Sequence, residues 1–209
     1  MNHDTTGASC EQSKAPFLIG MLIALFIIPT EYNLFGNNWI AYVSGTVVFP
    51  LAAIFSIWIS RSLFLERAPL LFQFTKYGLV GLSDTVISFG VLNAFASLTG
   101  ITKGHWLILF IAVGFICSMI NSYTWNSCWS FDENKCERST AQFVKYFTVI
   151  LFGIILNSCI VLYFTKIVPW YGFSSKQWLN VVSFSATLIA GTWNFLACKQ
   201  LVFKKGISP

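Results

Sequence analysis

Charged residues are scarce in this 209-residue chain. Only 10% are Asp, Glu, Lys or Arg, whereas 56% are hydrophobic, and a soluble globular domain carries about 25% charged residues. So few charges cannot cover the surface of a soluble domain, and the 17% aromatic content is the reverse of a disordered composition. Together with a mean hydropathy of +0.68, these shortages predict an all-α polytopic membrane protein.

Groups that carry catalysis or bind metals are equally few. The two histidines, His3 and His105, are far apart in the sequence, so no histidine-centred triad or metal cluster can be assembled. No phosphate-binding or metalloprotease motif is present. The six cysteines include no C-x-x-C pair and are expected to be free thiols. We therefore predict no enzyme activity, no cofactor and no metal. The net charge of +5 is scattered between apolar segments, which argues against nucleic acid as a partner.

Six apolar segments are present, and a helix needs about 20 residues to cross the hydrocarbon layer. They cover residues 17–35, 39–60, 77–98, 105–127, 146–165 and 179–202. The first is the weakest because Pro29 and Glu31 follow its clean apolar run. It either crosses the membrane with Glu31 at the far interface or re-enters on the same side.

Basic residues in the connections predict the orientation. Ten of the 13 Lys and Arg residues fall in the tails and the loops after the second and fourth segments, and three fall on the other side. Because positive charge marks the cytoplasmic side, both termini are predicted to lie in the cytoplasm, with the chain in the cytoplasmic (inner) membrane.

An internal duplication is visible in the second part of the chain. The run Gln73-Phe-Thr-Lys-Tyr77 opens the third segment and Gln142-Phe-Val-Lys-Tyr146 opens the fifth, while Trp129-Ser-Phe131 matches Leu201-Val-Phe203. Each repeat holds two helices, so both repeats share one orientation. The predicted organisation is a cytoplasmic N-tail (1–16), an extra N-terminal helical hairpin and loop (17–71), and a four-helix core (72–204) of repeats 72–132 and 141–204.

One acidic residue lies inside a confidently apolar segment. Asp84 follows the start of its segment by roughly 10 Å of helix, and such a group should face other helices or a wet cavity. It is either a proton or ligand site, or a carboxylate paired with Lys76 or satisfied by neighbouring hydroxyls.

Neutral polar side chains form stripes at helical spacing. The fourth segment carries Ser118, Asn121, Ser122, Trp125 and Trp129, with Asn126 at the border; Asn157 and Asn194 lie in the fifth and sixth. Such stripes line a hydrated path or hydrogen-bond helices together. Stripes at the same end of both repeats favour a path that opens toward the cytoplasm.

Lysines gather at the predicted cytoplasmic ends of three core segments. Lys76, Lys145 and Lys199 either serve as topology signals or attract an anionic headgroup. Beside aromatic residues such as Trp125 and Trp129, they are typical of a seat for a phosphorylated lipid that carries a polar cap. Replacing Lys76 and Lys145 by Gln is then expected to weaken binding of the lipid phosphate.

Several short motifs appear together in one order. They are Lys-Tyr-Gly-Leu-Val-Gly at 76–81 with Asp84-Thr85, Asn126-x-x-Trp129-x-Phe131, and Asn194-Phe195 leading to Lys199-x-x-Val202-Phe203. Over residues 72–204 this order and spacing resembles the GtrA-like family of small membrane proteins with two helical hairpins.

The resemblance implies a role in cell-surface polysaccharide synthesis or glycosylation. Family members are thought to flip polyprenyl-phosphate-linked sugars across the membrane, beside a glycosyltransferase, which would make this sugar-lipid and that enzyme the partners. Four core helices are few for a closed path, so a homodimer is plausible. Two alternatives stay open, namely an assembly subunit for a glycosyltransferase and a proton-coupled small-molecule exporter that uses Asp84.

Overall fold

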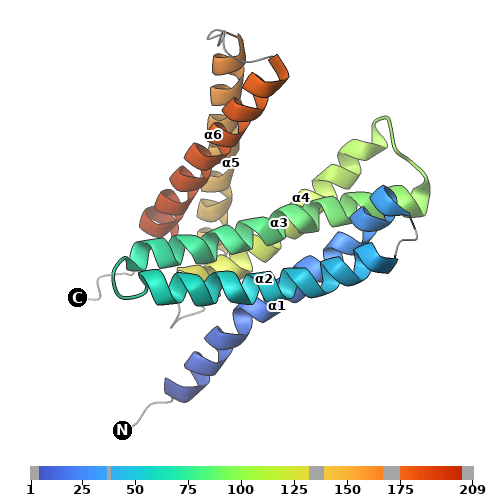
Figure 1. The fold of residues 1–209 in the computed structure, drawn as a ribbon. Coiled ribbons are helices and arrows are strands. Elements are labelled where there is room, and N and C mark those ends of the chain that lie inside the picture. Colours follow the sequence, from blue (N-terminus) through green and yellow to red (C-terminus); the bar gives the residue numbers. More distant parts are fainter. Residues whose placement is uncertain (1–4, 37–38, 132–138, 167–174, 204–209) are drawn as a thin grey trace. The chain divides into compact units, whose positions relative to one another are not determined.

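The computed structural model describes residues 5–36, 39–131, 139–166 and 175–203 (Figure 1), and within these ranges every regular element is helical. The helices are α1 (Thr5–Phe35), α2 (Trp39–Phe64), α3 (Pro69–Thr99), α4 (Trp106–Trp125) with the π-helical turn η1 (Asn126–Ser130), α5 (Thr140–Lys166), and α6 (Ser175–Ala197) with the π-helical turn η2 (Cys198–Val202). Six of these helical segments are long and apolar enough to cross a membrane, which confirms the predicted fold class.

The helices extend beyond the apolar segments that predicted them. The expected N-tail is helical from Thr5 onward, and α3 begins at Pro69 rather than at residue 77. Hydropathy marks only the apolar part of a helix, whereas the cooperative backbone hydrogen bonding of a helix continues into the residues that flank it. Pro69 stands at the start of α3. Proline has no backbone N–H, but the first N–H groups of a helix have no intrahelical partner, so nothing is lost there.

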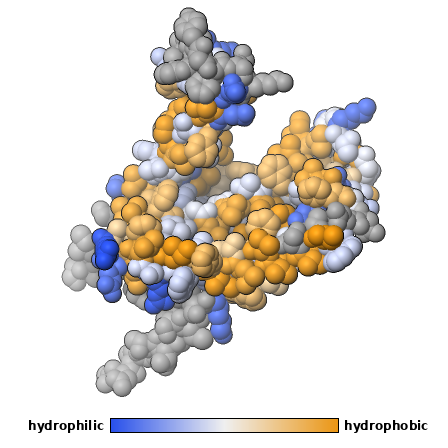
Figure 2. All heavy atoms as spheres, in the orientation of Figure 1, coloured by the Kyte–Doolittle hydropathy of each residue, from blue (hydrophilic) through white to orange (hydrophobic). Residues whose placement is uncertain are grey.

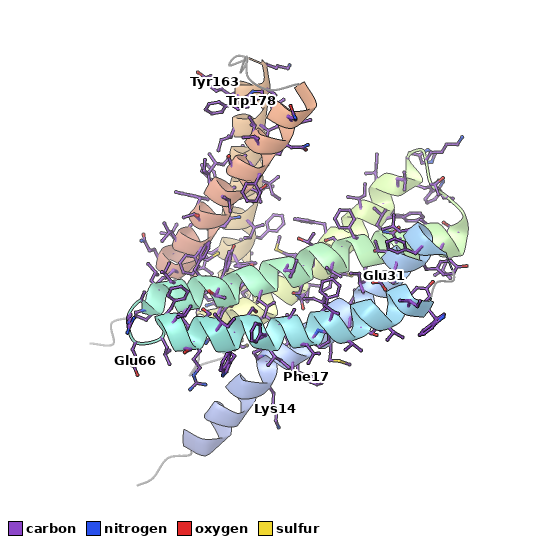
Figure 3. All side chains as sticks on the ribbon, viewed as in Figure 1. Lys14, Phe17, Glu31, Glu66, Tyr163 and Trp178 are labelled. Carbon is purple, nitrogen blue, oxygen red and sulfur yellow. The ribbon has the colours of Figure 1, made fainter. Side chains whose placement is uncertain are left out.

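The first helix runs without a break past both of its prolines, Pro16 and Pro29. Its stretch Lys14–Phe35 is 22 residues long and apolar enough to span the membrane, which favours crossing over re-entry. Glu31 lies near the end of this stretch (Figure 3). Its carboxylate is buried against Gly45 of α2, and Oε2 has no hydrogen-bond partner among the described residues.

The chain divides into two compact units, Met1–Glu137 and Arg138–Pro209, here called unit 1 and unit 2. In unit 1, α1 packs against both α2 and α3, and α3 packs against α4. The shared core consists of Ala15, Ile19, Ile23, Ala53, Ile57, Leu79, Val80 and Trp129. The N-terminal hairpin therefore covers one face of the first repeat.

Glycine allows close approach between these helices. A Cβ at Gly20 would lie 2.5 Å from the Pro50 Cα, and one at Gly90 would meet the carbonyl oxygen of Phe26. Small residues at such crossings let backbones pack closely in lipid, where packing rather than the hydrophobic effect drives helix association.

Amide and hydroxyl side chains tie α1 to α3 beyond this crossing. Asn33 Nδ2 donates to Asn93 Oδ1 at 2.9 Å, Asn93 Nδ2 donates to Thr30 Oγ1 at 3.2 Å, and the Ser97 hydroxyl donates to Asn33 Oδ1 at 2.7 Å. This interhelical network fixes the hairpin to the first repeat with directional contacts, in addition to the apolar packing.

Unit 2 is the hairpin of α5 and α6. Its contact face includes Val182, Ala186 and Ala190, all buried, and at the far end Trp178 Nε1 donates to the Phe164 carbonyl at 3.0 Å (Figure 3). Apolar side chains dominate the visible surface of the protein (Figure 2), as expected for helices surrounded by lipid tails.

The cysteines depart from expectation at one position. Cys117, Cys159 and Cys198 are free thiols, but Cys128 is disulfide-bonded. The expectation of free thiols was wrong for Cys128 because it rested on sequence spacing, whereas a disulfide requires only that two Cα atoms approach to about 4.4–6.8 Å.

Candidate functional site

The two repeats have the same contacts at their predicted cytoplasmic ends. Gln73 Nε2 donates to the Ser130 carbonyl at 2.9 Å, and Gln142 Nε2 donates to the Val202 carbonyl at 3.5 Å. Rings pair in the same way. The Tyr77–Phe131 centroids are 5.7 Å apart, and the Tyr146–Phe203 centroids are 6.0 Å apart.

Both even-numbered helices of the repeats end in a π-helical turn. The Phe131 amide donates to the Asn126 carbonyl at 3.0 Å, and the Phe203 amide donates to the Cys198 carbonyl at 2.8 Å. Single π turns often occur at functional sites. These matched turns and contacts, at offsets of 69 residues in the odd helices and 72 in the even helices, support a duplicated hairpin.

The three predicted phosphate-binding lysines have different surroundings. Lys76 is buried; its Nζ lies 3.4 Å from the Trp129 carbonyl oxygen, 4.9 Å from the Phe72 ring centroid and 5.4 Å from the Trp129 ring centroid. Lys145, its counterpart in the second repeat, is exposed, and Lys199 is half-buried. The carbonyl end of a helix and aromatic faces both stabilise a cation, so Lys76 holds α3 to α4 in this structure.

Asp84 belongs to a hydrogen-bonded cluster between α3 and α4. Asn121 Nδ2 donates to Asp84 Oδ1 at 2.8 Å and to Ser83 Oγ at 3.0 Å, and the Ser122 side chain also hydrogen-bonds Asp84. Asn126 Nδ2 extends the chain by donating to Ser122 Oγ at 3.3 Å. We call Ser83, Asp84, Asn121, Ser122 and Asn126 the α3–α4 polar cluster. The structure thus brings four predicted site residues together.

The same level of the second repeat is built differently. At the positions equivalent to Ser83 and Asn121, the rings of Phe152 and Trp193 pack with centroids 5.3 Å apart. At the positions equivalent to Asp84 and Ser122, the Asn194 side chain lies against the Cα of Gly153. Asn194 Oδ1 is buried and accepts no hydrogen bond within the described residues.

The remaining predicted residues have separate roles. Ser118 is buried, and its hydroxyl donates to the Phe115 carbonyl at 2.9 Å, while Asn157 Nδ2 donates to Thr187 Oγ1 at 3.3 Å. Trp129 is part of the unit 1 core, and Trp125 packs against it half-buried. A sugar-stacking role for these two tryptophans stays a prediction.

Sequence reasoning did not assign roles to Ser83 or Phe72. Ser83 is adjacent to Asp84 and therefore points about 100° around the helix from it, yet the Asn121 amide reaches both residues. Phe72 lies four residues before Lys76, a spacing that places both side chains on one helix face. Searching one turn on either side of each ionisable residue would have found Phe72.

Helical hairpins that are long and apolar enough to cross a membrane define a multi-pass membrane protein, and the first repeat holds the α3–α4 polar cluster. The sequence matches the family model of the GtrA/DPMS transmembrane domain over residues 76–205, and the chain belongs to this family. Searches of curated proteins and of solved structures found no match. Family membership suggests a membrane protein in processes that involve polyprenyl-phosphate sugars.

Proposed function

We propose that this protein flips a polyprenyl-phosphate-linked sugar across the cytoplasmic membrane for cell-surface polysaccharide synthesis or glycosylation, without catalysing a covalent step. Both termini face the cytoplasm, where a membrane glycosyltransferase supplies the lipid-linked sugar. The lysines at the cytoplasmic ends attract the phosphate, the polar side chains of the repeats accept and donate hydrogen bonds to the sugar, and the polyprenyl chain stays in lipid.

The observation that carries this proposal is the exposure of Lys145. This lysine belongs to the end of unit 2 where the Gln142–Val202 and Tyr146–Phe203 contacts hold α5 against η2, and the half-buried Lys199 lies in η2. Lysines at headgroup depth attract anionic lipids by about 1 kcal/mol each. An exposed cation at this end of the hairpin suits a lipid phosphate.

The α3–α4 polar cluster lowers the energetic cost of moving sugar hydroxyls through the hydrocarbon layer. A hydroxyl that enters hydrocarbon without a hydrogen bond costs roughly 2–7 kcal/mol, so a hexose needs polar partners along its route. Asp84 of α3 and Asn121 and Ser122 of α4 provide donors and acceptors between two neighbouring apolar spans.

The test is transport in proteoliposomes that contain the full chain and a short-chain polyprenyl-phosphate hexose. The wild type is expected to move the lipid, and Lys145→Gln is expected to slow transport about five- to tenfold, since one phosphate contact is lost. Lys166→Gln is the matched control, because Lys166 is exposed at the opposite end of the same helix; it should transport like the wild type.

Other outcomes would favour the alternatives. If folded protein moves no lipid-linked sugar but co-purifies with a glycosyltransferase, the assembly subunit is supported and flipping is rejected. If a pH gradient drives export of small cations and Asp84→Asn abolishes it, the proton-coupled exporter is supported. Equal loss in Lys145→Gln and Lys166→Gln would contradict the role given to Lys145.

A further inference from the structure

The Asp84 carboxylate has unused hydrogen-bonding capacity. A carboxylate offers about four lone-pair sites, and its side-chain partners are the neutral groups of Asn121 and Ser122. Lys76, about 12 Å away along α3 at the usual helical rise, directs its ammonium to the Trp129 carbonyl instead. The carboxylate can therefore accept further hydrogen bonds from a ligand.

Space for a ligand lies beside this carboxylate. Asp84 as a residue is half-buried, and its carboxylate lies among the neighbouring groups of α3 and α4. Gly81 lies about one helical turn from Asp84 toward the predicted cytoplasmic end, and Gly78 lies nearly two turns from it. Both glycines are exposed, and a Cβ at either would meet nothing within 4 Å. The surface of α3 is thus bare next to the one acidic group of the α3–α4 polar cluster. The missing side chains of Gly78 and Gly81 leave room on the surface of α3 beside Asp84.

The negative charge of the Asp84 carboxylate limits the kinds of ligand that it can bind. A carboxylate accepts hydrogen bonds from hydroxyls and pairs with an ammonium, but it repels another carboxylate when both are removed from water. Neutral Asn and Ser side chains would serve any sugar equally well. An acid at this place instead discriminates by charge, at the cost of placing an ionisable group in a membrane span.

We propose that Asp84 is the sugar-selecting residue of the proposed translocator, which accepts lipid-linked neutral sugars and amino sugars with a free amine and rejects lipid-linked uronic acids. This inference rests on the proposed function. Asn121 and Ser122 are positioning residues that hold the carboxylate at the α3–α4 interface, next to the bare surface of α3 at Gly81.

The experiment compares three substrates with the same short polyprenyl phosphate and different sugars, namely a neutral hexose, a hexosamine with a free amine, and a hexuronate. Wild-type protein in proteoliposomes is expected to move the first two and to move the hexuronate at least about tenfold more slowly. Asp84→Asn, which keeps the shape and removes the charge, should reduce this preference to less than about threefold. Asp84→Glu, which keeps the charge, should retain it.

The outcomes separate this inference from the proposed function. If all three lipids move at equal rates, or if Asp84→Asn keeps the tenfold preference, charge selection by Asp84 is overturned and flipping stands. If no lipid-linked sugar moves, both fail. Should Asp84→Asn stop all transport, binding of the three lipids to that variant in detergent decides: an unchanged preference overturns the inference, and a lost preference supports it.

Discussion

The two repeats agree at their ends and differ in the middle of the membrane. At the predicted cytoplasmic end each has a glutamine bonded to a carbonyl of a π-helical turn and a tyrosine packed on a phenylalanine. Deeper in the membrane, Asp84 and Asn121 of the first repeat have Gly153 and Trp193 as counterparts. The contacts that hold each hairpin together occur in both repeats. The hydrogen bond between an amide and a membrane carboxylate, Asn121 to Asp84, belongs to the first repeat.

The surroundings of the repeats differ as well. In the first repeat, α3 is covered by the N-terminal hairpin, and Lys76 is buried. In unit 2, α5 packs against α6 and η2, and Lys145 is exposed. The same lysine in the same motif is therefore buried in helix packing in one repeat and exposed in the other.

The largest difference between the two repeats is expected when the polar contact of the first repeat is removed. Asn121→Leu deletes the donor to Asp84 and Ser83 and leaves the carboxylate with fewer partners in a membrane span. Lipid-sugar transport should fall at least about tenfold, since an unsatisfied buried partner costs roughly 1–3 kcal/mol. The matched change Trp193→Leu replaces a half-exposed ring at the equivalent position and should leave transport within about threefold. Equal losses would show that the two repeats contribute alike.

A second prediction concerns the close crossing in the first repeat. A Cβ at Gly114 would lie 2.8 Å from the Ser88 carbonyl oxygen, whereas one at Gly81 would meet nothing within 4 Å. Gly114→Ala should lower thermal stability in detergent by about 1–3 kcal/mol, because overpacking forces the helices apart. Gly81→Ala should be neutral or slightly stabilising, since alanine favours helix. Similar stability of the two variants would contradict the close approach of α3 and α4 at Gly114.

A third prediction separates the roles of the equivalent lysines. Lys76→Gln removes a buried cation from the Trp129 carbonyl and two aromatic rings, and we expect a loss of about 1–2 kcal/mol in unfolding free energy. Lys145→Gln at an exposed site should change stability by less than about 0.5 kcal/mol. Thermal unfolding of both variants in one detergent measures the difference. Destabilisation by Lys145→Gln alone would reverse the assignment.

Much of this organisation could be predicted from the sequence. Hydropathy placed six helices correctly because the length of an apolar segment is set by the thickness of the bilayer. The repeat was visible in Gln73–Tyr77 and Gln142–Tyr146, and helical spacing placed Asn121 and Ser122 on one face. The Ser122 hydroxyl on Asp84 agrees with the alternative of satisfaction by neighbouring hydroxyls, whereas the Asn121 amide was not part of that alternative.

Other features depend on tertiary contacts that the sequence does not encode locally. Lys76 is buried where the Trp129 carbonyl and the rings of Phe72 and Trp129 surround its ammonium, and a basic residue near a helix end looks the same in the sequence whether it is covered or exposed. The motifs over Asn126–Phe131 and Lys199–Phe203 marked the ends of two helices, but they did not predict that these ends are π-helical turns. The helical N-tail was missed because hydropathy does not detect a polar helix.

The smallest expected effect tests whether the shared ends are equally strong. Gln73 donates to its carbonyl at 2.9 Å and Gln142 donates at 3.5 Å, the limit of a hydrogen bond. Interhelical hydrogen bonds in membranes contribute about 0.6 kcal/mol on average, so Gln73→Leu should destabilise the protein by roughly that amount and Gln142→Leu by less. Because leucine is similar in size and apolar, differences in packing are kept small. If Gln142→Leu has the larger effect, this glutamine contributes more to the end of the second repeat than the donor–acceptor distances indicate, and the end proposed as the seat for the lipid phosphate would be the more strongly held of the two.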